Sequence, residues 1–167
     1  MGQVTREIAK LDVDKLLEML NAALSEEWLA YYQYWIGARV VEGKMRSAVE
    51  AELLEHANEE LEHAEMIAER IIQLGGTPVL SPDEWSKLAH CKYARPDDTY
   101  VTAILNDNLG GERCAIKRYQ EIAEFTFGKD YITHKMALSI LEDELEHEQE
   151  IEDWLNDIEV SIDHRGR

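Results

Sequence analysis

The chain has 167 residues, and 35 acidic side chains against 17 basic ones give it a formal charge of −18 at pH 7. This length suffices for one domain with a core that needs no disulfide framework, which two cysteines could not supply. Such an acidic surface repels nucleic-acid backbones and attracts cations. The N-terminus has no apolar run behind it, and no stretch approaches the ~18 apolar residues of a spanning helix, so we expect a cytoplasmic protein without a membrane partner.

Four long helices are predicted along the chain. Apolar residues recur with helical spacing over residues 12–42 and 44–74, and again over residues 98–127 and 130–157. Gly43 and Gly128 separate the helices of each pair, and joints this short can only reverse the chain. The sequence therefore predicts an all-α domain over residues 1–167, built from two antiparallel helical hairpins.

One long crossover joins the two hairpins. It covers residues 76–97 and contains all three prolines of the chain. An extended segment of this length reaches about 70 Å, whereas a thirty-residue helix is about 45 Å long. The crossover can therefore start the second hairpin at the far end of the bundle. Within it, Ser81 and Pro82 have the residue types of a helix start, which predicts a short helix ending near Leu88.

The two halves carry the same polar motif in the same order. The first long helix of each half contains E-x-x-A-x-x-x-Y, and the second contains E-x-x-H. By helical spacing, every glutamate and histidine of these motifs lies on the apolar stripe of its helix and points inward. The six residues are Glu27, Glu60, His63, Glu112, Glu144 and His147.

Four inward carboxylates need a compensating charge, because each would cost several kcal/mol if buried without a partner. They must be protonated, paired with bases, or bound to cations, and no lysine or arginine occupies a matching inward position. Four carboxylates balance two divalent ions, and one oxo bridge balances the charge that oxidation of both ions adds. Oxygen ligands with one imidazole per ion suit iron or manganese better than structural zinc.

This pattern resembles the ferritin-like di-iron four-helix bundles, and the likeness extends from about Leu16 to Trp154. The segments LNAALSEEWLAYYQY and EELEHAEMIAERI are most similar to the bacterioferritin branch. The resemblance implies that the six motif residues form a catalytic ferroxidase centre, with Glu60 and Glu144 as bridging ligands. It implies iron as the metal, with manganese or zinc as substitutes. Bacterioferritins carry a haem-ligating methionine where this chain has Leu61, so no haem is expected.

The outline of the chain resembles the Dps proteins, which form twelve-subunit cages. The short crossover helix is similar to theirs, and SIDHRGR at the end of the chain is a poor helix, so no fifth long helix is expected. Together with two cysteines, these features resemble the Dps-like thioferritins. The resemblance implies a homo-oligomeric 12-mer that oxidises Fe(II) with hydrogen peroxide, or O2, and stores ferric mineral, thereby limiting oxidative stress.

Two readings of the cysteines remain open. Cys91 and Cys114 are either unrelated small apolar residues or, as the thioferritin resemblance implies, a loop-to-helix disulfide near the centre. Cys114 follows Glu112 by two residues, which turns its side chain about 200° around the helix. We therefore expect it to face away from the metals and not to be a ligand.

Several neighbours of the motif also have two readings. His56 is either an accessory iron ligand or a hydrogen-bonded core histidine. Asp143 and Glu59 are either partners of His63 and His147 across the bundle or solvated acids. Tyr34 and Tyr119 are expected in the core, close enough to hydrogen-bond a ligand.

Two other functions compete with an iron-storing ferroxidase. One is a rubrerythrin-like di-iron peroxidase without mineral storage, although the chain lacks the paired CxxC motifs that usually accompany it. The other is a metal-free helical interaction module. DNA binding is not expected, because the tails offer only Arg6, Lys10, Arg165 and Arg167 against a strongly negative body.

Overall fold

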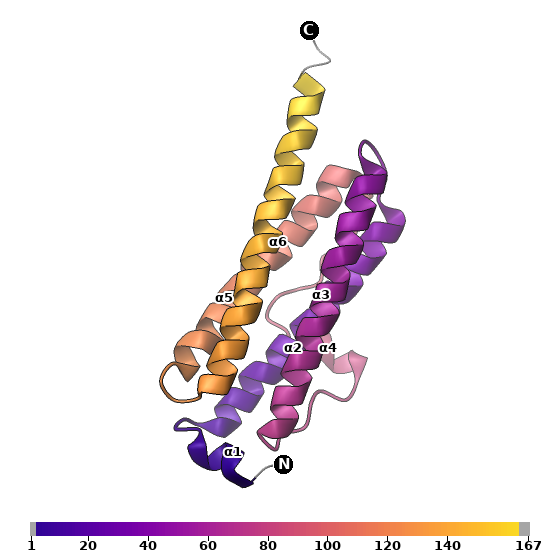
Figure 1. The fold of residues 1–167 in the computed structure, drawn as a ribbon. Coiled ribbons are helices and arrows are strands. Elements are labelled where there is room, and N and C mark those ends of the chain that lie inside the picture. Colours follow the sequence, from indigo (N-terminus) through magenta and orange to yellow (C-terminus); the bar gives the residue numbers. More distant parts are fainter. Residues whose placement is uncertain (1–2, 164–167) are drawn as a thin grey trace.

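The computed structural model describes residues 3–163, which form six helices. Figure 1 shows four long helices packed side by side as a bundle, which confirms the predicted all-α architecture. These are α2 (Val13–Val40), α3 (Arg46–Gln73), α5 (Val101–Thr126) and α6 (Tyr131–Asp163). The crossover contains α4 (Pro82–Leu88), and a short α1 (Gln3–Ile8) precedes the bundle.

The ends of the chain differ from the sequence-based expectation. Helix α6 continues past residue 157 to Asp163, so the segment that begins at Ser161 starts as helix and not as an irregular tail. The apolar stripe continues with it, because Ile158 is only 1% exposed and belongs to the same core cluster as Ile151. Figure 1 shows the C-terminal end of α6 reaching beyond the turn between α2 and α3. The tail residues Arg165 and Arg167, and the side chain of Arg6, lie outside what the structure describes.

A tight turn joins α2 to α3 and also touches the start of α5. Gly43 has a φ of +109°, and a Cβ there would lie 2.5 Å from the ring of Tyr100. Glycine is therefore required both for the backbone conformation and for the close approach. The backbone of Glu42 bonds to Thr99 and Val101 on either side of Tyr100, which ties the first hairpin to the second.

The interior has two apolar clusters with a polar layer between them. One cluster, which includes Leu20 and Ile67, fills the end of the bundle near the α5–α6 turn. The other, which includes Leu53 and Ile104, fills the opposite end. The buried motif residues lie between these clusters, so apolar packing above and below fixes the helices that carry them.

The crossover runs along the face formed by α2 and α5, behind the bundle in Figure 1. Its helix α4 begins as predicted, because the Ser81 side chain accepts a hydrogen bond from the backbone of Asp83. Trp85 of α4 stacks on Trp28 of α2, with ring centres 5.5 Å apart and planes 7° from parallel. The crossover is therefore packed onto the bundle by an aromatic pair.

A buried ion pair holds the end of α3 to the start of α6. Arg70 Nη2 lies 2.8 Å from Asp130 Oδ2, and Arg70 Nε donates to Thr133 Oγ1 at 2.8 Å. Replacing Asp130 with alanine should lower the free energy of unfolding by about 3–5 kcal/mol, because Arg70 stays buried without its partner. The shift of the unfolding midpoint measures this effect.

The matched control for this prediction is Asp12→Ala. Asp12 caps α2 through an exposed bond to the backbone of Lys15, with no arginine partner, so its loss should cost only about 1 kcal/mol. Equal shifts in the two variants would show that the buried pair is not what stabilises this end of the bundle.

Candidate metal centre

All six motif residues meet in the polar layer of the bundle. Helices α2 and α5 each supply one glutamate, and α3 and α6 each supply a glutamate with a histidine one turn later. All are between 0 and 3% exposed. The helical phase predicted from the sequence therefore brings together Glu27, Glu60, His63, Glu112, Glu144 and His147.

Two glutamates face both histidines. Glu60 Oε2 lies 3.7 Å from His63 Nδ1, and Glu60 Oε1 lies 3.5 Å from His147 Nδ1. Glu144 repeats this arrangement, at 3.3 Å from His63 Nδ1 and 3.6 Å from His147 Nδ1. Each of these carboxylates thus presents one oxygen to each half of the centre, which is the arrangement of a carboxylate bridging two ions.

The other two glutamates each belong to one half. Glu27 Oε2 lies 3.6 Å from His63 Nδ1, and Glu112 Oε2 lies 3.6 Å from His147 Nδ1. The result is two groups of three carboxylates and one imidazole, with ligand atoms within 4.8 Å of one another in each group. The groups share Glu60 and Glu144.

Outer carboxylates fix the orientation of both imidazoles. His63 Nε2 lies 3.1 Å from Asp143 Oδ2, and His147 Nε2 lies 2.7 Å from Glu59 Oε2. With a metal bound, a proton on each Nε2 would leave Nδ1 as a lone-pair donor facing the centre. The pairing predicted across the bundle for Asp143 and Glu59 is therefore present.

Two buried tyrosines orient Glu112 and Glu27, the two glutamates that each face one histidine. The Tyr34 hydroxyl donates to Glu112 Oε1, and the Tyr119 hydroxyl donates to Glu27 Oε1. Burial, and then the charge of the bonded carboxylate, raise the pKa of each tyrosine well above its ordinary value, so both hydroxyls keep their protons. Each tyrosine thus occupies one carboxylate oxygen and leaves the other to face its histidine.

The atoms that face the middle of the centre lack hydrogen-bond partners. In the described part of the chain, nine buried side-chain nitrogen or oxygen atoms have none, and seven of them belong to this centre. Buried polar atoms are normally satisfied, so such a concentration calls for a ligand. Carboxylate and imidazole donors around two shared positions fit a pair of divalent cations. The seven atoms are Glu27 Oε2, Glu60 Oε1, His63 Nδ1, Glu112 Oε2, both Glu144 oxygens and His147 Nδ1.

The carboxylates fall into two protonation classes when no metal is bound. Burial, and then the negative charges of Glu60 and Glu144, raise the pKa of Glu27 and Glu112 well above the ordinary value. Burial also opposes ionisation of Glu60 and Glu144, and the charge of Glu60 adds to this at Glu144, but the two nearby histidines outweigh these effects and lower the pKa of each carboxyl. Without metal, Glu27 and Glu112 therefore bind protons more readily than Glu60 and Glu144.

The histidines carry the balancing charge. Burial lowers the pKa of His63 and His147, but attraction of the charged ring to three surrounding carboxylates outweighs it and raises the pKa of each well above its ordinary value. Both imidazoles are therefore protonated in the metal-free protein. The two positive rings balance the negative charge of Glu60 and Glu144.

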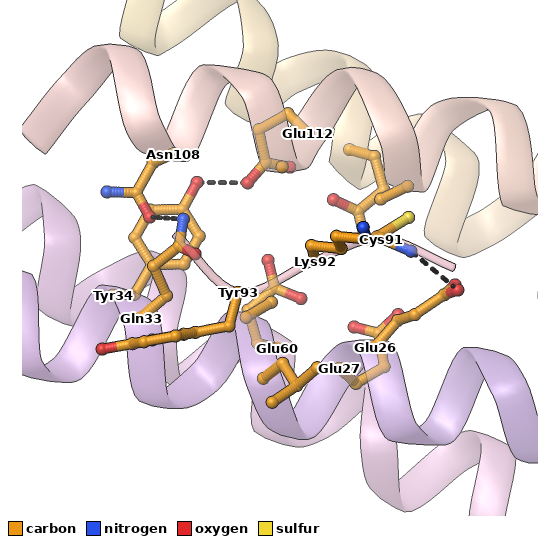
Figure 2. A pocket seen from close by; sticks show the side chains of 15 residues that line it. Glu26, Glu27, Gln33, Tyr34, Glu60, Cys91, Lys92, Tyr93, Asn108 and Glu112 are labelled. Atoms are coloured by element: carbon orange, nitrogen blue, oxygen red, sulfur yellow. Dashed lines mark hydrogen bonds between the residues drawn. The ribbon is translucent and has the colours of Figure 1, made fainter. Parts of the chain in front are cut away.

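A small cavity lies between the centre and the crossover. It has a volume of about 30 Å³, which is room for about one water-sized molecule. Figure 2 shows Cys91, Lys92 and Tyr93 of the crossover passing between Glu112 on α5 and the glutamates Glu60 and Glu27. The centre is thus open to a small molecule on its α2–α5 side.

The crossover is anchored over this cavity by residues that sequence reasoning missed. We call residues 90–94 the strap. Glu26 accepts hydrogen bonds from the backbone of His90 and Cys91, and it forms a buried ion pair with Arg118 at 3.0 Å. Gln33 accepts from the backbone of Ala94. No spacing pattern marks these residues, because their role depends on where the crossover runs.

A disulfide joins the strap to α5. Cys91 and Cys114 are bonded, with Cα atoms 5.7 Å apart and 23 positions apart in the chain. The bridge implied by the thioferritin resemblance is therefore present, and the reading as two unrelated residues is wrong. Because the Cys114 sulfur is engaged in the bridge, it does not act as a ligand, as helix geometry had indicated.

Reduction should lower stability without unfolding the bundle. Closing a loop of this length contributes about 3 kcal/mol in the chain-entropy account, while Glu26 and Gln33 still hold the strap. We expect a lower melting temperature in the presence of a reductant. A Cys91→Ser, Cys114→Ser variant is the control, and an equal response of that variant to reductant would contradict the assignment.

The chain belongs to the ferritin-like family, because a ferritin-like domain matches residues 17–160. Among its relatives, the DNA protection during starvation protein of Pyrococcus furiosus is 40% identical over 147 residues, covering 87% of this chain and 79% of that protein. Bacterioferritin of Rhodobacter capsulatus is 31% identical over 134 residues, which cover 80% of this chain and 78% of that protein.

A solved structure agrees along nearly the whole chain. A dodecameric thioferritin from Bacteroides fragilis, described as bacterioferritin-related, is 55% identical, with a TM-score of 0.96 and 98% of each chain covered. Dps from Thermosynechococcus elongatus shares the fold at 17% identity, with a TM-score of 0.81. These findings confirm the resemblance to Dps-like thioferritins. Among residues 3–163, no helix combines the length and apolar character that crossing a bilayer requires.

Proposed function

We propose that this protein is a ferroxidase that oxidises Fe(II) at the six-residue centre and stores the ferric product in an oligomeric cage. The observation that carries this proposal is the pair of bridging glutamates, each with one oxygen toward each histidine, together with the seven unpartnered donor atoms. The assignment of Glu27, Glu60, His63, Glu112, Glu144 and His147 as iron ligands is part of the proposal.

The residues would act on Fe(II) as their substrate. The two shared ligand groups hold a pair of ions side by side, each with one imidazole and three carboxylates. Oxidation by peroxide needs one electron from each ion: 2 Fe(II) + H2O2 + 2 H⁺ gives 2 Fe(III) + 2 H2O. The centre supplies both electrons to one oxidant molecule, so the O–O bond is cleaved without releasing a hydroxyl radical.

The size of the cavity beneath the strap supports the proposal that the oxidant is a small molecule. Its volume of about 30 Å³ restricts access to small molecules, and its lining includes Glu27, Glu60, Glu112 and Glu144 of the centre. We propose hydrogen peroxide as the preferred oxidant. The stoichiometry of Fe(II) oxidised per peroxide added, and the rate relative to O2-saturated buffer, measure this preference.

Acidic residues on the opposite side of the centre support the proposal that the ferric product is stored. Between α3 and α6 lies an open groove whose lining is almost entirely acidic, which we call the acidic groove: Glu55, Glu59, Asp143, Glu146, His147 and Glu150. Carboxylates attract iron cations, so product has a path away from the centre on this side. The Bacteroides fragilis relative is dodecameric, and we propose a 12-subunit cage with this groove toward its interior.

Gel filtration combined with iron loading tests the proposal. A large particle that takes up many more ions than its centres can hold, with about two Fe(II) oxidised per peroxide, is the expected result. A small oligomer that consumes peroxide without accumulating iron would favour the rubrerythrin-like alternative. A protein that takes up no metal would reject both functions.

A further inference from the structure

The cavity beneath the strap lies on the side where the centre exposes its carboxylates. Four of the six residues of the centre line it, namely Glu27, Glu60, Glu112 and Glu144. Oxygen atoms without a hydrogen-bond partner occur on each of the four. A molecule that approaches the centre from the α2–α5 side therefore has to enter this cavity, and the strap forms part of its wall.

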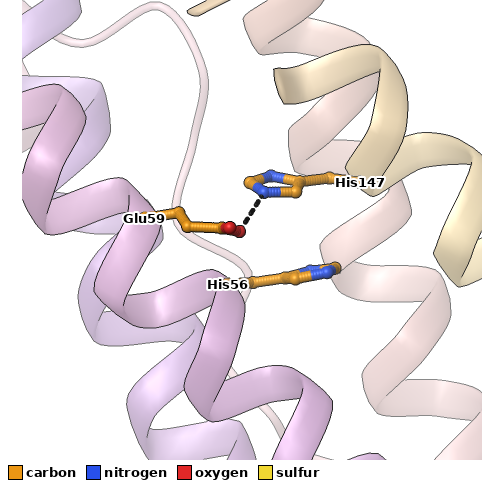
Figure 3. A group of neighbouring side chains, drawn as sticks. All are labelled: His56, Glu59 and His147. Atoms are coloured by element: carbon orange, nitrogen blue, oxygen red, sulfur yellow. Dashed lines mark hydrogen bonds and ion pairs between the residues drawn. The ribbon is translucent and has the colours of Figure 1, made fainter. Parts of the chain in front are cut away.

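The α3–α6 side presents groups that suit a cation. Of the six residues of the centre, His147 is the one that lines the acidic groove, and its Nε2 is bonded to Glu59. Figure 3 shows the His147 and His56 rings one over the other, with centres 4.2 Å apart. His56 is buried and its Nε2 lies 2.8 Å from Glu150 Oε2, as expected for a hydrogen-bonded core histidine. An acidic lining attracts cations but gives an uncharged oxidant no advantage, so the strap side is the approach for the oxidant.

Glu26 and the disulfide hold the first half of the strap. Glu26 Oε1 accepts hydrogen bonds from the backbone of His90 and Cys91, at 2.6 and 3.2 Å. Glu26 is only 6% exposed, and its charge is balanced inside the protein by Arg118. Burying two charged groups costs more than packing apolar side chains in their place would. What this pair holds in position is the strap.

Gln33 holds the other half of the strap. Its Oε1 accepts from the backbone N–H of Ala94 at 2.6 Å, and its Nε2 donates to Asn108 Oδ1 of α5 at 3.1 Å. Gln33 and Asn108 are both buried and both line the cavity. Figure 2 shows the two side chains joined beside the strap. Gln33 thereby ties the strap, α2 and α5 together at the wall of the cavity.

We propose that the strap selects the oxidant by size, and that Gln33 is a specificity-determining residue of the centre. The strap leaves a cavity of about 30 Å³, so a hydroperoxide with a bulky organic group reaches the centre only when the strap moves away. Moving it breaks the hydrogen bond between Gln33 and Ala94. The selected class is therefore hydrogen peroxide and other small oxidants. This inference rests on the proposed function, because it names the oxidants that the ferroxidase centre accepts.

Both kinds of peroxide undergo the same two-electron reduction. With an organic hydroperoxide, 2 Fe(II) + ROOH + 2 H⁺ gives 2 Fe(III) + ROH + H2O, so the O–O bond breaks and two ions are oxidised, as with hydrogen peroxide. The two oxidants differ in intrinsic reactivity. That difference cancels when the ratio of their rates is compared between the wild type and a variant, and the change in the ratio then reports access.

The test compares Fe(II) oxidation by hydrogen peroxide and by cumene hydroperoxide, a bulky organic hydroperoxide, in the whole protein. The wild type should react faster with hydrogen peroxide. Gln33→Leu should lower this preference about two- to tenfold, because leucine has a similar size but cannot hold Ala94 by a hydrogen bond. The Cys91→Ser, Cys114→Ser variant removes a different anchor and should lower the preference as well. It keeps the test decisive if Gln33→Leu does not fold.

The matched control is Gln120→Leu. Gln120 donates to Glu124 on the exposed face of α5, away from the strap, so the same substitution there should leave the preference for hydrogen peroxide at its wild-type value. An equal loss of preference in Gln120→Leu and Gln33→Leu would overturn the assignment of Gln33.

Hydrogen exchange in the metal-free protein gives a second readout. The amide of Ala94 should exchange faster in Gln33→Leu than in the wild type, while the amides of α3 keep their protection. Unchanged exchange at Ala94 would show that Gln33 does not hold the strap. Faster exchange with an unchanged preference would show that the strap does not select the oxidant. Failure of the proposed function looks different, because the wild type would then oxidise Fe(II) with neither peroxide.

Discussion

Replacing Glu60 and Glu144 together with alanine is expected to reduce Fe(II) oxidation to below about 1% of the wild-type rate. These two residues are the ones whose oxygens face both histidines, so in the proposed centre their loss would remove ligands from both ions at once. Changes to residues that merely orient a ligand typically cost 10–100-fold, and loss of two shared ligands should cost more. Stopped-flow absorbance of ferric product measures the rate.

The fold should survive this change. The double variant removes two ionised carboxylates from the interior, and the two imidazoles can then lose their protons and remain buried as neutral rings. The apolar clusters on either side of the layer are untouched. Circular dichroism and gel filtration should therefore match the wild type.

The control removes the same number of acids from the same two helices. Glu62 and Glu142 lie close to the two motifs along the chain but are exposed on the surface. Glu62→Ala, Glu142→Ala should oxidise Fe(II) at the wild-type rate. If the Glu60→Ala, Glu144→Ala protein also kept its rate, the bridging assignment would be rejected.

The helices and the convergence of the centre could be predicted because both depend on local periodicity. An E-x-x-H motif on an apolar stripe places both side chains inward whatever the rest of the chain does. The partners of the histidines could be predicted for the same reason, since Glu59 and Asp143 each precede a motif glutamate by one residue. The short helix in the crossover carried its own start signal at Ser81.

The strap could not be predicted, because its position depends on contacts between residues far apart in the chain. Glu26 appears in the sequence as one more acid beside Glu27, and only the folded crossover turns it into an acceptor for two backbone N–H groups. The extension of α6 was missed because SIDHRGR has weak helix propensity, while Ile158 already continued the apolar stripe. Tertiary packing outweighed propensity there.

Loading the centre with two divalent ions is expected to release about four protons per subunit. In the metal-free protein, Glu27 and Glu112 hold protons and both histidines are charged, as the directions of their pKa shifts indicate. The two ionised glutamates and two charged imidazoles sum to zero. Four ionised carboxylates, two neutral imidazoles and two divalent ions also sum to zero. The difference between these two neutral states is two protons from the glutamates and two from the histidines.

The pH dependence of metal binding follows from this exchange. Protons and metal ions compete for the same donor atoms, so the combined affinity for the pair should rise with pH by up to about four powers of ten per unit. The sign is fixed by the raised pKa values of the terminal glutamates and the histidines, which keep those protons in place until metal displaces them. Acidification should therefore expel the ions while the bundle remains folded.

Calorimetry with Co(II) in buffers of different ionisation enthalpy counts the protons directly. Titration up to two Co(II) per subunit counts the protons that belong to the centre. The Glu60→Ala, Glu144→Ala protein should release far fewer protons, since neither metal position keeps the ligands that the two positions share. Release of fewer than about two protons from the intact centre would mean that its histidines and terminal glutamates are already deprotonated without metal, and the charge balance derived from burial would be wrong.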